Sequence, residues 1–277
     1  SYQEINKGTI IKTFNIKSQA IENQKVKSIF KKNYQGLMYC LKNRIQEQLI
    51  SPGHRVVRKK FQTINKYVLE PIEEIIKLKS PFIIHIAGKN VNKKVNISDE
   101  QISLMAWIIA EGSVEHPGDN YRSCWRVSIY QSKLKNRENY EEIKKLLNHF
   151  KLVYAEFETA SLGENVVRLR LNAESSRIIH QWFGTKENIH FIPDSLFNLD
   201  EKQSRLFIQT YLKADGTEDC KISTVEPILS EELQRVIVNC GWGFTVLIRP
   251  PTIGKKQIYI LRLIKHQKTY IEKIEKI

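Results

Sequence analysis

Two segments of the sequence end an apolar run on an acidic residue that a glycine follows. The first is LMAWIIAEGS, residues 104–113, and the second is IQTYLKADGT, residues 208–217. Each run predicts a helix that stops at the glycine, so Glu111 and Asp215 occupy equivalent last positions. A carboxylate there opposes the helix dipole at a cost of about 0.3–1 kcal/mol. Because this unfavourable placement of an acid occurs at two matching positions, it indicates a functional role.

Small residues in both runs predict that the two helices pack closely. Ala106 and Ala110 lie four residues apart, and Thr210 and Ala214 repeat this spacing. Close packing would bring the two acids together, and like charges repel unless a cation lies between them. Hard oxygen ligands suit Mg2+ or Mn2+, and paired metal ions can activate water for phosphodiester hydrolysis. In the alternative interpretation, each acid is only the exposed last residue of its helix.

The composition favours a polyanionic partner. The 277 residues carry a formal net charge of +14, and 41% of them are hydrophobic, so the chain is globular and basic. Nucleic acid is the first candidate partner and an anionic membrane surface the second. In the alternative interpretation, the charge only forms an ordinary solvated surface. No segment is long enough to span a membrane, and no signal-peptide pattern begins the chain. The four cysteines form no CxxC pair, which favours a reducing, intracellular setting such as cytoplasm, nucleoid or organellar matrix.

From about residue 98, the elements repeat. Ser98 with Gln101, and later Asp200, are start signals for helices that end at Gly112 and Gly216. After each of these two helices, the sequence predicts a strand, a helix, two strands and a further helix. The last of these helices would form a helical tail at the end of the sequence. The expected domains are a first repeat at 98–199 and a second at 200–277.

Residues 1–95 have another character. Short segments rich in β-branched and aromatic residues alternate with turn signals, which predicts a β-rich segment. The Pro-Gly turn in ISPGHRVV precedes His54, and the polar stretch 89–96 is predicted to be a linker.

LMAWIIAEG and IQTYLKADG resemble the paired motifs of the LAGLIDADG homing endonucleases, and the likeness covers residues 98–277. The resemblance implies an α+β fold of two pseudo-symmetric αββαββα repeats with the motif helices at their interface. It implies a monomer that cuts double-stranded DNA at a long asymmetric site with bound Mg2+ or Mn2+. In the family the last motif acid binds metal, which passes this role to Glu111, standing in place of Asp, and to Asp215. The resemblance also implies a basic residue near each metal. This residue would be Lys186 in the first half, and Lys265 or Lys268 in the second.

The N-terminal segment resembles the Hint splicing domain of inteins. SPGH is similar to the TxxH block of that family, with Ser51 in the Thr position and His54 as the histidine that assists the first acyl shift. Alternatively, His54 only anchors the turn. Ser1 is a hydroxyl residue, but its context differs from the usual first block, and YIEKIEKI ends the sequence without a His-Asn pair. We therefore expect a Hint-like remnant that does not splice.

Alternation in the strands predicts a DNA-facing side. Trp125, Val127 and Ile129 point one way, as do Val167, Leu169 and Leu171 in the later strand. Arginine on the opposite face suits a β-ribbon in the major groove, and lysines more plausibly contact phosphates. A solvated sheet face is the alternative for each residue. The predicted DNA contacts are Arg122, Arg126, Ser128, Tyr130, Gln131, Lys133, Arg168, Arg170, Arg249 and Arg262.

Three functions therefore compete. The first is the metal-dependent endonuclease, the second a nucleic-acid-binding protein that has lost cleavage, and the third a remnant of a protein-splicing element. Basic clusters within residues 1–95 add the hypothesis that this segment also contacts DNA.

Overall fold

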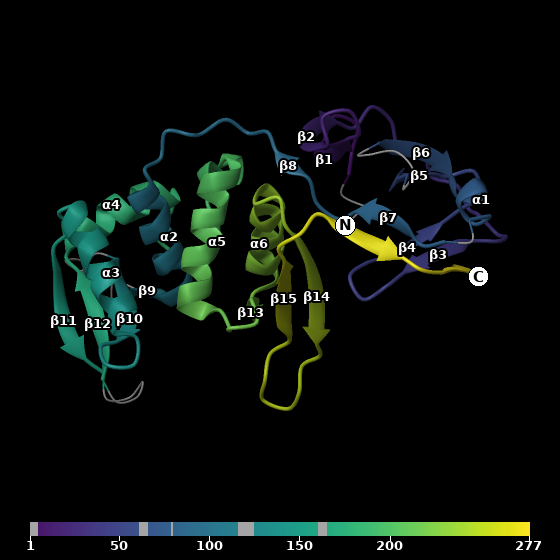
Figure 1. Ribbon diagram of the computed structural model, residues 1–277. Helices are drawn as coiled ribbons and strands as arrows, with labels where there is room; N and C mark the ends of the chain where they lie inside the picture. Colours follow the sequence, from purple (N-terminus) through teal and green to yellow (C-terminus); the bar gives the residue numbers. More distant parts are fainter. Residues whose placement is uncertain (1–4, 61–65, 79, 116–124, 160–164) are drawn as a thin grey trace. The chain divides into compact units, whose positions relative to one another are not determined.

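The computed structural model describes residues 5–60, 66–78, 80–115, 125–159 and 165–277, so the predicted DNA contact Arg122 lies outside the described residues. The chain divides into two compact units (Figure 1). The β-rich unit comprises Ser1–Val91, Gly241–Thr245 and Leu263–Ile277. The two-repeat unit comprises Asn92–Cys240 and Val246–Arg262. In the described part of the chain, no helix combines the length and the apolar character that crossing a membrane requires.

Short antiparallel strands dominate the β-rich unit, as the sequence predicts. Its sheets have the orders β1-β2-β8, β16-β7-β5-β6 and β17-β3-β4. The apolar core includes Leu41, Val56, Ile72 and Ile84. The elements are β1 (Ile10–Asn15), β2 (Ala20–Lys25), β3 (Tyr39–Lys42), β4 (Glu47–Ile50), β5 (Arg55–Lys59), β6 (Tyr67–Pro71), α1 (Ile72–Ile75), β7 (Phe82–His85), β8 (Lys89–Asn90), β16 (Lys268–Ile271) and β17 (Ile274–Lys276).

The end of the sequence differs from its prediction. Residues 268–271 pair with β7 and residues 274–276 pair with β3, so the predicted helical tail is wrong. Thr269 and Ile271 are buried and Tyr270 between them is 57% exposed, which is the period of two of a half-buried strand. Residues 263–277 therefore belong to the β-rich unit, although the sequence interpretation gave them to the second repeat.

The first half of the two-repeat unit has the predicted order αββαββα. Its sheet is antiparallel with the order β11-β12-β10-β9, and helices α2, α3 and α4 all contact the central strand β10 (Figure 1). The α+β class is therefore confirmed. The elements are α2 (Asp99–Glu111), β9 (Gly112–Glu115), β10 (Arg126–Ser132), α3 (Arg137–His149), β11 (Tyr154–Glu158), β12 (Val166–Leu171) and α4 (Ala173–Phe183).

The second half repeats most of this pattern. Gly112 pairs with Ile129 in the first half, and Gly216 forms the matching bridge to Ile222 in the second. The sheet order β13-β15-β14 follows β10-β12-β11 of the first half. No helix follows β15 in the described residues, so the predicted last helix of this repeat is wrong. The elements are η3 (Asp194–Asn198), α5 (Glu201–Asp215), β13 (Lys221–Thr224), α6 (Pro227–Asn239), β14 (Gly243–Arg249) and β15 (Ile258–Ile264).

Both predicted helix starts are confirmed. The Ser98 hydroxyl accepts a hydrogen bond from the Gln101 backbone N–H at 3.1 Å. The Asp200 carboxylate accepts one from the Gln203 backbone N–H at 2.7 Å. Each cap satisfies a backbone donor that the first helical turn leaves without a partner.

Glycine ends both helices for lack of space rather than for a left-handed conformation. Gly112 has φ −88 and ψ 165, and Gly216 has φ −99 and ψ 168, so both are extended. A Cβ on Gly112 would lie 2.3 Å from the Ile108 carbonyl oxygen, and one on Gly216 would lie 2.4 Å from that of Leu212. The chain can therefore leave each helix directly behind its acidic last residue only at a glycine.

Gly216→Ala should lower the free energy of unfolding by about 2 kcal/mol or more, because the added Cβ forces the backbone apart. Urea unfolding measures this. Gly184→Asn is the matched control, since Gly184 has a left-handed φ of 70 with open space around it, which asparagine tolerates. Equal losses in the two variants would contradict the steric argument.

Candidate active site

Helices α2 and α5 lie side by side and carry the two acids at their last residues (Figure 1). Ala106 is fully buried and Thr210 is 2% exposed, as the prediction of close packing requires. Glu142 of α3 holds both helices near this end. It accepts a hydrogen bond from Trp107 Nε1 of α2 at 3.4 Å and an ion pair from Lys213 Nζ of α5 at 2.8 Å.

The electrostatics of this end disfavour negative charge. Burial, and then the charge of Asp215, raise the pKa of Glu111 to about 7. Burial also raises the pKa of Asp215, although its side chain is more exposed than that of Glu111. Burial and both carboxylates raise the pKa of the Tyr211 phenol. Among the described residues, no basic side chain acts on Glu111 to lower its pKa.

Two carboxylates on which no described cation acts fit a divalent metal ion. The described residues contain no cluster of three or more His, Cys, Asp and Glu side chains that could enclose an ion. Mg2+ does not need such a cage, since it commonly uses one or two carboxylates and keeps positions for water and substrate phosphate. Glu111 and Asp215 are therefore the residues that would hold it.

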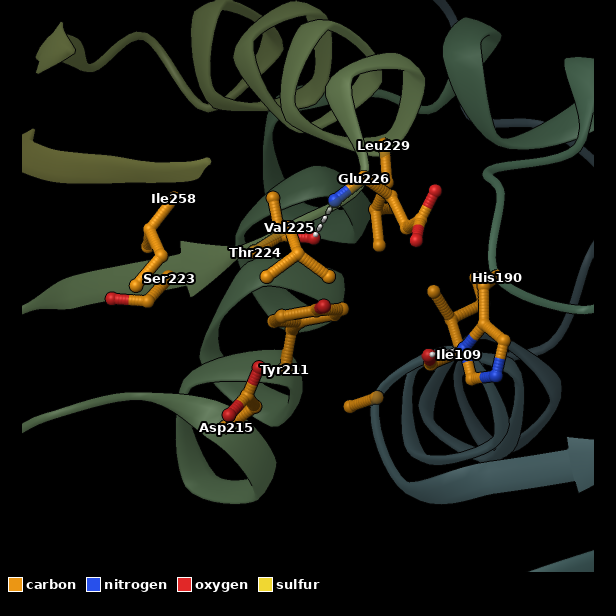
Figure 2. Close-up of a pocket in the computed structure, with 11 residues that line it drawn as sticks. Ile109, His190, Tyr211, Asp215, Ser223, Thr224, Val225, Glu226, Leu229 and Ile258 are labelled. Atoms are coloured by element: carbon orange, nitrogen blue, oxygen red, sulfur yellow. Dashed lines mark hydrogen bonds between the residues drawn. The ribbon is translucent and has the colours of Figure 1, made fainter. Parts of the chain in front are cut away.

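A cavity of about 420 Å³ lies beside Asp215 (Figure 2). Ile109 of α2, Tyr211 of α5 and Glu226 before α6 line it, and His190 stands on the side of Ile109. The sequence analysis missed His190 and Tyr211. Tyr211 stands four residues before Asp215, so the helical period could have indicated it. His190 comes from a loop that no local pattern connects to this site.

The loop that carries His190 is fixed by three contacts. His190 Nδ1 lies 3.2 Å from the Ile109 carbonyl oxygen. Ile189 is buried against Gly112, and the Ile192 backbone N–H donates to the Glu232 carboxylate at 2.7 Å. The imidazole is thus positioned by α2 and α6 at the edge of the cavity.

None of the predicted basic partners lines the cavity beside Asp215. Lys186 follows α4 and is exposed. It lines a second cavity with Arg177 and His180 of that helix. Lys265 lies in the β-rich unit, where its Nζ is 5.6 Å from the centre of the Trp242 ring. Lys268 is in β16 of the same unit. The catalytic role of each stays a prediction.

The polar face of the first sheet is built around one carboxylate. Val167, Leu169 and Leu171 are buried, and Arg168 and Arg170 alternate with them as predicted. Glu115 of β9 pairs with both arginines, at 3.1 Å and 2.7 Å. Among the described residues, the Nε atoms of Arg168 and Arg170 are buried and have no hydrogen-bond partner.

Other predicted contacts of this sheet are placed differently. Ser128 is fully buried and donates to Glu115, and Gln131 is 4% exposed and accepts from Asn136. Both are therefore covered in this structure. Tyr130 and Lys133 remain accessible, and Lys133 lies over the Tyr140 ring at 5.8 Å.

The remaining predicted arginines are partly or fully exposed. Arg126 lies 3.5 Å from the Leu171 carbonyl oxygen and is half-buried. Arg249 ends β14 and is exposed. Arg262 of β15 is exposed and lies opposite Lys221 of β13.

His54 follows the predicted Pro52–Gly53 turn, where Gly53 has the positive φ of 74. Its side chain is exposed, and its carbonyl oxygen accepts from the Ile72 backbone N–H at 2.9 Å. The turn is confirmed, while the resemblance to a splicing domain stays a prediction.

Comparison with solved structures finds homing endonucleases. Variants of the homing endonuclease I-DmoI are similar over 61% of this chain and 90% of theirs, with 18% identity and a TM-score of 0.46. I-DmoI in complex with DNA and Ca matches over 61% and 84%, with 18% identity and a TM-score of 0.46. The homing endonuclease I-WcaI bound to its DNA recognition sequence matches over 61% and 77%, with 13% identity and a TM-score of 0.34. No protein-family model and no curated protein matches the chain.

Glu111→Gln should stabilise the metal-free protein above about pH 7. The pKa of Glu111 is raised in the folded state, so the parent is favoured below the ordinary value of 4.5 and loses stability as the pH rises towards 7. The shift corresponds to at most about 3 kcal/mol. Urea unfolding with a chelator at several pH values measures the difference, which should vanish below about pH 4.

Glu100→Gln, which changes an exposed acid at the other end of α2, is the control and should show no such gain. A pH-independent effect of Glu111→Gln would contradict the raised pKa.

Proposed function

We propose that this chain is a site-specific DNA endonuclease that hydrolyses phosphodiester bonds with Mg2+ or Mn2+. The observation that carries the proposal is the pair Glu111 and Asp215 at the ends of two packed helices. Both acids have raised pKa values, and no described basic group compensates Glu111. A net charge of +14 makes a small anionic substrate less suitable than a polyanion.

The two acids are the groups that hold the metal. When bound there, the ion supplies Lewis acidity at the phosphate and a more acidic water. Glu142 fixes both helices, which keeps the carboxylates in place without loop movement. Tyr211 lines the cavity beside Asp215, and His190 places an imidazole at the cavity edge, where it can accept a proton from water.

The polar sheet face is the proposed DNA contact. Arg168 and Arg170 stand two residues apart on one face of β12, and Arg126 and Tyr130 of β10 lie on the same face. Arginines held on strands suit guanine edges in the major groove. The proposed duplex contacts also include Arg249, Arg262 and Lys133. Of these, Lys133 contacts a phosphate.

The finer assignment is a two-motif LAGLIDADG endonuclease that acts as a monomer on a long asymmetric site. It is supported by the matching bridges Gly112–Ile129 and Gly216–Ile222. We propose residues 98–199 as the first repeat and the part of 200–277 up to Arg262 as the second. Both motif acids then come from a single chain.

Asp215→Asn should abolish double-strand cleavage, lowering its rate by about a hundredfold or more, because the amide cannot replace an anionic metal ligand. A diverse DNA library incubated with Mg2+, with the new ends sequenced, measures cutting and target together. Asp219→Asn is the control, since it removes a nearby exposed carboxylate that pairs with Lys221. Equal cutting by parent and Asp215→Asn would refute the metal site.

A second function is a nucleic-acid-binding protein without cleavage. The observation that favours it is that none of the predicted basic partners Lys186, Lys265 and Lys268 lines the cavity beside Asp215. Under this alternative, the same library is not cut, and one sequence is retained by the parent and by Asp215→Asn alike.

Glu115→Gln should tighten binding to any duplex several-fold and reduce discrimination between sequences. The carboxylate neutralises Arg168 and Arg170 and fixes their geometry, so its loss leaves two mobile cations for phosphates. Titration of specific and random duplexes at several salt concentrations measures this. Glu141→Gln on the exposed surface of α3 changes the net charge equally and serves as control. An identical gain in both variants would contradict a specific role of Glu115.

A further inference from the structure

One face of the sheet β16-β7-β5-β6 carries a row of polar side chains away from the core. Lys268 lies opposite His85, Lys59 lies opposite Ile83, and Lys59 also lies opposite Tyr67. Directly opposite residues share a face, as do residues two apart on one strand. Lys268, His85, Lys59 and Tyr67 therefore stand side by side across all four strands, within the β-rich unit.

Aromatic contacts bury the middle of this row. The His85 ring stacks on Phe14 of β1 with centroids 4.2 Å apart, and it lies 4.3 Å from the Tyr67 ring. Two polar atoms are enclosed by this packing. Among the described residues, His85 Nε2 and Tyr67 Oη are buried and have no hydrogen-bond partner. A buried polar atom without a partner is unfavourable, so a ligand that bonds to both atoms would be stabilised here.

The row also brings positive charges together. Burial lowers the pKa of His85 most, and Lys268 and then Lys59 lower it further, against the Ala87 and Gln267 carbonyls, which raise it. Burial and then Lys59 lower the pKa of Lys268. The acid of this sheet, Glu70, is engaged elsewhere by Arg58 and Lys60. No described carboxylate forms an ion pair with Lys268. An anion would relieve this repulsion.

The tautomer of His85 selects the kind of anion. Nδ1 lies 2.9 Å from the Ala87 carbonyl oxygen, which can only accept, so Nδ1 carries the proton. In the neutral ring, Nε2 is then an acceptor and needs a donor. Monohydrogen phosphate offers an acidic O–H for Nε2 and oxygens for Tyr67 Oη, Lys59 and Lys268. Sulfate has no proton to donate near neutral pH, and neither has a phosphodiester.

We propose that Lys59, Tyr67, His85 and Lys268 form a binding site for a phosphate that carries an acidic proton, either inorganic phosphate or a phosphate monoester. The site lies in the β-rich unit and does not depend on the proposed nuclease activity. Phosphate would accept from the two ammonium groups and the phenol and donate to His85 Nε2, which satisfies both buried atoms.

Thermal unfolding of the full chain tests the site at matched ionic strength in chloride, sulfate and phosphate near neutral pH. Phosphate should raise the unfolding midpoint by about 2–4 °C over the other two salts. The double variant Lys59→Gln with Lys268→Gln should lose this gain. In chloride it should be at least as stable as the parent, since it removes a repulsion. Lys27→Gln with Lys31→Gln, two exposed lysines of the same unit, should keep the gain.

His85→Phe keeps the stacking and removes the acceptor, so it should abolish the preference for phosphate over sulfate. At about pH 6, where methyl phosphate still carries a proton, methyl phosphate against dimethyl phosphate separates a monoester from a diester, and only the monoester should stabilise the parent. Equal stabilisation by sulfate and phosphate, or a phosphate gain that survives in the Lys59 and Lys268 double variant, would overturn the proposal.

Discussion

The mutual repulsion of Glu111 and Asp215 is the constraint on which the two-repeat unit depends. Two carboxylates at adjacent helix ends oppose both helix dipoles and each other, so other interactions must hold them there. The buried α2–α5 contact and the bonds that Glu142 makes to both helices supply that support. The glycines then let the chain leave each helix at once, which keeps the acids at the surface edge rather than inside the core.

Periodic signals made much of this arrangement predictable. The caps at Ser98 and Asp200, the two helix ends and the alternation around Arg168 are local features, and each is found where the sequence places it. Residues that reach the site from distant segments were not predictable. His190 stands beside Ile109 only because the loop after α4 returns to α2, and no spacing in the sequence records that return.

The last fifteen residues show why a repeat can mislead. The second half copies the first in its motif helix, in the glycine bridge and in its sheet order, so a closing helix was the natural expectation. The sequence there has an alternation of buried Thr269 and Ile271 with exposed Tyr270, and strand pairing to β7 satisfies it. Tertiary pairing in the β-rich unit therefore outweighed the symmetry of the repeat.

Basic side chains are paired with an acid on the first sheet, whereas Lys268 in the β-rich unit has no described acidic partner. On the first sheet, Glu115 lies between Arg168 and Arg170, so two guanidinium groups can be half-buried and held in one orientation. Arginines held in this way lose less side-chain entropy when they bind, which favours recognition of geometry over simple attraction to phosphate. In the row of Lys59, His85 and Lys268, no described acid pairs with Lys268, and the cations lower one another's pKa values. Both proposals use the protein's positive charge for binding, and only the second requires an external anion, to offset the charge of Lys268 beside two buried polar atoms.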